Sequence, residues 1–168
     1  MLRIMLLLAT FCVVAAAPAI AGGLPDKLTF GYEYEGEVDA SPKACEATVR
    51  EVVEWSDEEV KRATADVCAA RKAHVDAYAA IQQSYKEFAK TFGEDTRLNT
   101  GEAVEHFQQL VKECIDHKTG ITTGGHNIAI DIIPNQIASE CLALGKRLLD
   151  EETAWYKAPA ETHTRLSP

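Results

Sequence analysis

Two Glu–His pairs are the side chains whose type and spacing could support metal chemistry. Glu102 with His106, and Glu113 with His117, are each four residues apart, which places both members of a pair on one face of a helix. Carboxylate and imidazole groups can bind zinc, given further ligands from elsewhere. The pairs are offset by about 16 Å of helix, so they cannot share one ion. A solvated helix face stabilised by such pairs explains the pattern equally well.

Motifs for catalysis are missing from the sequence. There is no Gly-x-Ser-x-Gly, and the Gly- and Thr-rich segment 118–125 matches neither glycine-rich phosphate-binding pattern, so it reads as a connector. No nucleophile, base and orienting group can be placed together. We therefore expect a protein that is not an enzyme and has no cofactor.

Residues 1–21 have the three-part pattern of a secretory signal peptide. Arg3 precedes an apolar stretch over 4–17, and the segment closes with an Ala-x-Ala ending at Ala21. An uncleaved membrane anchor is the alternative, although the apolar stretch barely reaches the length of a bilayer core. We expect cleavage after Ala21, a periplasmic or secreted location, and no membrane contact after cleavage.

The cysteines point to the same compartment. Cys12 would leave with the signal peptide, and four remain: Cys45, Cys68, Cys114 and Cys141. An even number of cysteines in an oxidising compartment indicates two disulfides, and four free thiols would be expected only if export failed. No Cys-x-x-Cys is present, which removes thioredoxin-like and zinc-ribbon sites.

An aromatic arm is predicted over residues 22–40. Apolar and polar side chains alternate from Leu28 onward, the period of an extended, strand-like segment. Such an arm either covers the core with its aromatic side or offers that side to a partner. The candidate partner-binding residues are Phe30, Tyr32, Glu33, Tyr34 and Glu35.

Four helices are predicted from start signals and apolar periodicity. The Ser41-Pro42 pair starts a helix that runs to about residue 54, and the capping box from Ser56 to Glu59 starts an unbroken pattern over 57–92. A third helix follows Asn99 and ends near residue 118. The last covers about 134–157. Residues 127–133 alternate Ile with other residues and read as a short strand, with a helical turn running into Pro134 as the alternative.

The pattern over 57–92 has one apolar row with a spacing of seven. That row consists of Val60, Val67, His74, Ile81 and Phe88, and we interpret His74 as a packed core residue. A single helix there would be about 54 Å long, whereas a compact domain of this size is about 40 Å across. The helix must bend or the molecule must be elongated. Packing within one subunit is favoured over a coiled coil with a second chain, because the intervening row is alanine.

Helix lengths select the cysteine pairing. In a hairpin that turns near Ser56, Cys45 and Cys68 lie at equal height, and a connector over 119–133 brings Cys114 level with Cys141. The predicted fold is mainly α: a disulfide-braced, four-helix bundle-like domain of two helical hairpins over 41–157, with the arm before it and a flexible tail over 158–168.

The net charge of the chain restricts the class of partner that it can bind. The 168-residue chain has 17 Lys and Arg against 26 Asp and Glu, a formal charge of −9, which excludes a surface built for nucleic acid. An acidic surface favours a basic protein partner through electrostatic steering. We expect an exported, non-enzymatic binding or inhibitory protein that acts through protein–protein contacts. A periplasmic helical domain that binds a small ligand or a metal is the alternative.

Overall fold

The structure is a computed structural model that describes residues 24–32, 35, 38–52, 56–92, 100–122 and 129–159. The predicted signal peptide over 1–21 lies outside these residues, as do Glu33, Tyr34 and 160–168 of the predicted tail.

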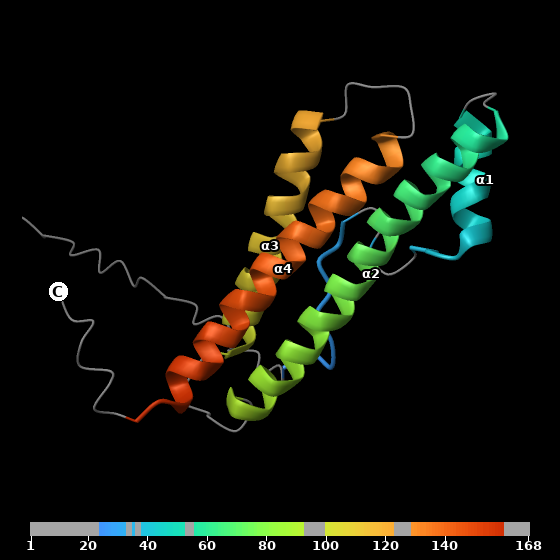
Figure 1. Cartoon of the computed structure of the whole chain (residues 1–168). Coiled ribbons are helices and arrows are strands. Elements are labelled where there is room, and N and C mark those ends of the chain that lie inside the picture. The colour runs from blue at the N-terminus through green and yellow to red at the C-terminus, as the bar shows by residue number, and fades with distance from the viewer. Residues whose placement is uncertain are drawn as a thin grey trace, which may run out of the picture.

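Four helices make up the described part of the chain: α1 (Pro42–Val52), α2 (Asp57–Phe92), α3 (Thr100–Thr122) and α4 (Ala129–Lys157). Figure 1 shows α1 folded back along the first turns of α2, and α2 and α4 side by side and running the same way. The third helix returns antiparallel to α4 and packs against it. No strand occurs within the described ranges, so the prediction of a mainly α fold with bundle-like packing is confirmed.

The first two predicted helix starts, at Ser41 and Ser56, have capping hydrogen bonds. Ser41 Oγ accepts a hydrogen bond from the Ala44 N–H at 3.3 Å, which begins α1. The Glu59 carboxylate accepts from the Ser56 N–H at 3.0 Å, which begins α2. The second helix continues without a break for 36 residues, and every member of its seven-spaced row is buried. The molecule is therefore elongated (Figure 1).

The predicted strand over 127–133 is wrong for its described residues, because α4 already begins at Ala129. Neighbouring side chains of this turn pack on opposite sides: Ile132 contacts the α1–α2 cluster and Ile133 contacts the main core. These two neighbouring isoleucines are therefore both partly buried in a helical turn, without a strand. Pro134 lies near the helix start, where its missing N–H costs a single hydrogen bond. The third helix also extends to Thr122, four residues into the predicted connector.

The two predicted disulfides are confirmed. Cys45 is bonded to Cys68 with 5.5 Å between their Cα atoms, and Cys114 to Cys141 with 6.0 Å. The first joins α1 to α2 and the second joins α3 to α4. Each disulfide therefore braces one antiparallel helix pair.

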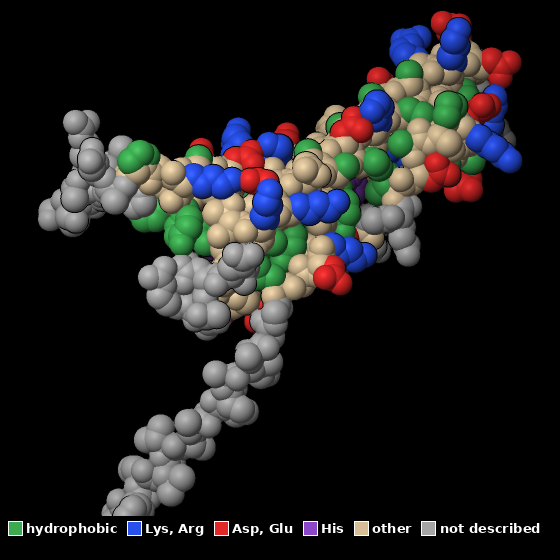
Figure 2. Space-filling model, turned by 90° about the horizontal axis from the view of Figure 1, so that it is seen from below, with side chains coloured by type: hydrophobic (Ala, Val, Ile, Leu, Met, Phe, Trp, Pro, Cys, Tyr) green, Lys and Arg blue, Asp and Glu red, His purple; other side chains and the backbone are tan. Residues whose placement is uncertain are grey.

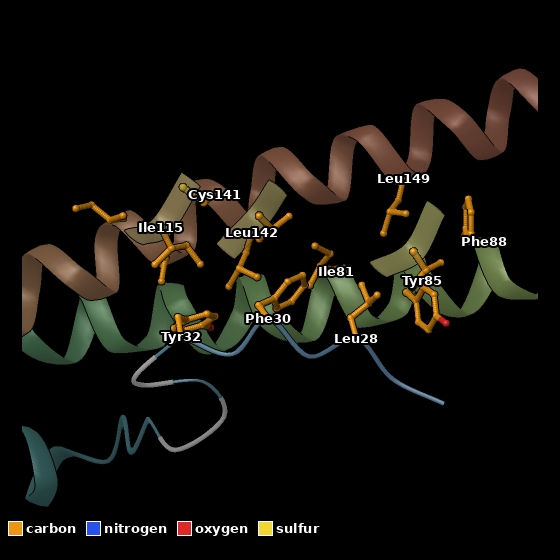
Figure 3. Close-up of a cluster of buried hydrophobic side chains, with 14 of the residues drawn as sticks. Leu28, Phe30, Tyr32, Ile81, Tyr85, Phe88, Ile115, Cys141, Leu142 and Leu149 are labelled. Carbon is orange, nitrogen blue, oxygen red and sulfur yellow. The ribbon is translucent and has the colours of Figure 1, made fainter. Parts of the chain in front are cut away.

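The main core lies between α2, α3, α4 and residues 24–32 of the arm. Leu28 is 0% exposed, Phe30 3% and Tyr32 8%. Figure 3 shows these three side chains pointing into the same cluster as Ile81 and Leu142. The arm completes the core, which is the first of the two alternatives for it.

Close packing of the three long helices depends on Gly145 of α4. A methyl group at this position would lie 2.9 Å from Val111 Cγ2 of α3 and 3.0 Å from Ile81 Cδ1 of α2. Both distances are shorter than carbon–carbon contact. Glycine thus lets α4 approach both neighbours.

Candidate functional site

Side chains of α2 and α3 bind the backbone of the arm. Gln82 of α2 accepts from the Leu28 N–H at 3.0 Å and donates to the Leu28 carbonyl at 2.8 Å. Tyr85 donates to the Pro25 carbonyl at 2.7 Å, and Gln108 of α3 donates to the Thr29 carbonyl. These bonds satisfy polar groups that a strand would pair in a sheet. An extended segment can therefore lie on helices with no second strand.

Three of the predicted partner-binding residues are within the described residues, and all three contact their own chain. Phe30 and Tyr32 are buried, because packing on the helices removes their rings from water. The Glu35 carboxylate accepts from the Phe30 N–H at 2.7 Å and from the Gly31 N–H. Gly31 has a φ of +65°, which suits glycine at this bend. These three side chains hold the arm in place, and little of their surface remains for contact with a partner.

A buried polar chain connects the arm to α4. The Tyr32 hydroxyl lies 2.6 Å from Nε2 of His74 in α2, and Nδ1 of His74 lies 2.8 Å from Oδ1 of Asn135 in α4. Asn135 Nδ2 then donates to the Asp131 carbonyl at 2.8 Å. His74 is 2% exposed and Asn135 7%. The prediction that His74 is a packed, hydrogen-bonded core residue is confirmed.

Arg71 extends this polar chain to α1. Its Nε and Nη2 donate to the two carboxylate oxygens of Asp131 at 3.0 and 2.6 Å, a bidentate pair with the geometry that Arg favours. Nη2 also donates to Thr48 Oγ1 of α1 at 2.8 Å, and Nη1 to the Asp39 carbonyl at 3.0 Å. One guanidinium thus joins the two hairpins and the segment between the arm and α1.

Burial changes the pKa values of the two ring groups in this chain. Desolvation, with a smaller contribution from Glu35, raises the pKa of Tyr32. Desolvation also lowers the pKa of His74 below its ordinary value of 6.5, although the hydrogen bond to Asn135 and the charge of Glu35 act in the opposite direction. Both groups are therefore neutral at neutral pH.

The predicted metal-ligand residues lie on an exposed face of α3. Glu102, His106, Glu113 and His117 are all exposed, and Glu113 accepts from Gln109 at 2.9 Å. Among the described residues, no three His, Cys, Asp or Glu side chains are grouped closely enough to hold a metal ion. Each Glu–His pair thus lacks a third ligand within that part of the chain.

An apolar surface lies along α3 and α4 beside the Cys114–Cys141 disulfide; we call it the α3–α4 surface. Its exposed side chains are Leu110 at 48%, Leu144 at 43% and Leu148 at 47%. The disulfide fixes the register of the antiparallel helices, so position 110, one turn before Cys114, faces positions 144–145, one turn after Cys141. Hydrophobic side chains also reach the surface between charged ones on the face shown in Figure 2.

Two hollows adjoin the α3–α4 surface. The first has a volume of about 430 Å³ and a mostly apolar lining: Phe88, Phe92, Thr100, Ala103, Val104, Phe107, Leu148, Leu149 and Glu152. The second is an open depression of about 570 Å³ lined by Leu110, Glu113, Cys114, Asp116 and His117. Among the described lining residues the charged groups are carboxylates, with one histidine and no Lys or Arg. The hollows are therefore mainly apolar with carboxylates in their linings, and beside them Lys112 is paired with Asp116 and Lys118 with Glu140.

Comparison with protein-family models, with curated proteins and with solved structures gives no match for this chain. Within the residues that the structure covers, no helix combines the length and the apolar character needed to cross a bilayer. Any function proposed for this chain must therefore be inferred from the positions of its own described residues.

Sequence reasoning did not find the α3–α4 surface or the partners of His74. The sequence places Leu144, Leu148 and Trp155 in one apolar stripe with Ile137 and Cys141, a pattern that predicts a core-facing side, yet the three side chains are 43%, 47% and 44% exposed. The glycine at position 145 is the available signal, because α4 packs tightly against α2 and α3 there, between the two leucines.

Proposed function

We propose that this chain is an exported, non-enzymatic binding protein, and that it takes a basic, amphipathic helix of a partner protein on the α3–α4 surface. The observation that carries the proposal is the juxtaposition of three exposed leucines with two hollows whose described linings contain carboxylates but no Lys or Arg. Exposed apolar side chains rimmed by charge mark interaction sites.

The arrangement of the three leucines favours a helix as the occupant. Leu110 of α3 is level with Leu144 of the antiparallel α4, and Leu148 follows one turn further along α4, so an apolar row of this kind offers a groove-like seat between two helices. A helix laid along such a seat buries one apolar face, which is the helix-in-groove mode of recognition. Lys and Arg on the flanks of that helix would then meet Glu113 and Glu152.

Export is supported by the same disulfides that fix this surface. Two disulfides, each within one helix pair, are typical of proteins that fold in oxidising compartments. A periplasmic or secreted location also agrees with the signal-peptide pattern over 1–21.

A synthetic peptide tests the proposed function without knowledge of the natural partner. The probe is an amphipathic helix about four turns long with Leu on one face and Lys on the other, and its counterpart has Glu in place of Lys. Calorimetric titration into the disulfide-bonded chain is expected to show binding of the Lys peptide, weakened by salt, and at least about tenfold weaker binding of the Glu peptide.

Paired variants locate the site. Leu148→Ser should weaken binding of the Lys peptide by about tenfold or more, because burial of one leucine contributes about 1.5–3 kcal/mol. Val75→Ser is the matched control, since Val75 is 41% exposed but lies on α2. Equal losses in the two variants, or equal binding of the two peptides, would contradict the proposal.

A further inference from the structure

The hydrogen bonds around His74 define which ring nitrogen carries the proton. Asn135 Nδ2 donates to the Asp131 carbonyl, so the Asn135 oxygen is the acceptor that faces His74 Nδ1. Nδ1 therefore carries the hydrogen. Nε2 of the neutral ring is then an acceptor, and the Tyr32 hydroxyl donates to it.

A second proton on His74 is incompatible with this arrangement. Both nitrogens of an imidazolium are donors, so Nε2–H would point at a hydroxyl that is itself donating. Tyr32 would have to turn its hydrogen away inside a site where the residue is 8% exposed. A buried donor without an acceptor is costly, as is a buried charge.

The groups around His74 do not offset that cost. On the arm side, Glu35 favours the imidazolium, but its carboxylate already accepts from two arm N–H groups and from Tyr78 of α2. On the α4 side, Asn135 is neutral and the charge of Asp131 is paired with Arg71 of α2.

Among the described residues of α3 and of the segment just before α1, no free carboxylate is added toward the ring. On α3, the Lys112 side chain lies 3.9 Å from the position of a Cβ at Gly31 and is paired with Asp116. Ahead of α1, Asp39 offers its carbonyl to Arg71, and its carboxylate accepts from the Ser41 N–H.

We propose that the Tyr32–His74 pair is an acid-sensitive latch, and that protonation of His74 frees the arm from the groove between α2 and α3. The direction of the pH dependence follows from proton binding. A freed His74 regains water and takes up a proton more readily than the latched one, so acid favours the freed arm. The latch is stable above the ordinary histidine pKa of 6.5 and weakens as the pH falls below it.

Freeing the arm changes what the protein exposes. Leu28, Phe30 and Tyr32 would leave the core, and the groove that they fill would open on α2 and α3. The disulfides would still hold both helix pairs, because neither bond involves the arm. The expected acid state is therefore helical but open on the arm side.

Amide hydrogen exchange on the disulfide-bonded chain tests the latch. Between pH 7.5 and pH 5, after correction for intrinsic exchange rates, the protection of the Leu28 and Phe30 amides should fall by roughly tenfold or more, the ratio that corresponds to one lost buried hydrogen bond. The Leu142 amide of α4 should keep its protection. Unchanged protection of the arm amides would overturn the proposal, as would an equal fall at Leu142.

Two variants assign the effect to this histidine. Glutamine can accept from Tyr32 and donate to Asn135 but cannot be protonated, so His74→Gln should remove the change between pH 7.5 and pH 5. His106→Gln, at an exposed histidine of α3, should leave it intact. A change that persists in His74→Gln would overturn the assignment to His74.

A measurement on the unsubstituted chain keeps the proposal testable if His74→Gln does not fold. Nitrogen NMR of the His74 ring should show an unprotonated Nε2 at pH 7.5 and proton uptake at the same midpoint as the loss of arm protection. The opposite tautomer, or proton uptake with the arm still protected, would contradict the latch.

Discussion

Replacement of both Cys114 and Cys141 by alanine is expected to lower the free energy of unfolding by about 3.5 kcal/mol. The bond closes a loop with a sequence separation of 27, and restriction of the unfolded chain by a loop of this length contributes about that amount. Denaturant unfolding of the double variant beside the parent chain, both under oxidising conditions, gives the value.

The other disulfide is the matched comparison for this prediction. The Cys45–Cys68 bond has a sequence separation of 23, so its removal should cost nearly the same in unfolding free energy. Only loss of the Cys114–Cys141 bond should also weaken binding of the Lys peptide, because that bond sets the register of the α3–α4 surface. A double variant at 114 and 141 that retains full stability would show that the bond is absent from the folded protein.

Truncation of Leu28 to alanine is expected to destabilise the protein by about 2–5 kcal/mol, although the residue lies outside every helix. Its side chain is 0% exposed and contacts the cluster shared by α2, α3 and α4, so the substitution leaves a cavity in the main core. The adjacent Lys27→Ala is the control, since Lys27 is exposed and should change stability by no more than about 0.5 kcal/mol. Thermal and denaturant unfolding at pH 7.5 measure both.

Equal stability of the Leu28→Ala and Lys27→Ala variants would mean that the arm is detached in solution. In that case protonation of His74 could not free the arm, because the arm would already be detached. The prediction therefore tests the packing of the arm at neutral pH, where the Tyr32–His74 bond is intact.

Helix starts and disulfide pairing could be predicted because both depend on local signals. The Ser41 hydroxyl caps α1 and the Glu59 carboxylate caps the start of α2 at Ser56, each three residues away from the N–H that it binds, and such contacts form within one turn. Once helix lengths are known, cysteine heights follow at 1.5 Å per residue. The pairing thus required no knowledge of how the two hairpins pack together.

The polar network around His74 and Arg71 could not be predicted because it depends on the register between the two hairpins. Arg71 meets Asp131, and His74 meets Asn135, across sequence separations of 60 and 61, and no local pattern encodes that match. The aromatic arm was ambiguous for a related reason. Alternation identifies an apolar side, but the same side can face a core or a partner.

We propose that partners dock on α3 and α4, whereas the aromatic arm belongs to the core. The amide NMR footprint of the Lys peptide on the disulfide-bonded chain at pH 7.5 distinguishes the two surfaces. We expect the largest shift changes at Leu110, Leu144 and Leu148, with Leu28 and Phe30 unchanged. Shift changes centred on Leu28 and Phe30, with the three leucines unaffected, would refute docking on α3 and α4.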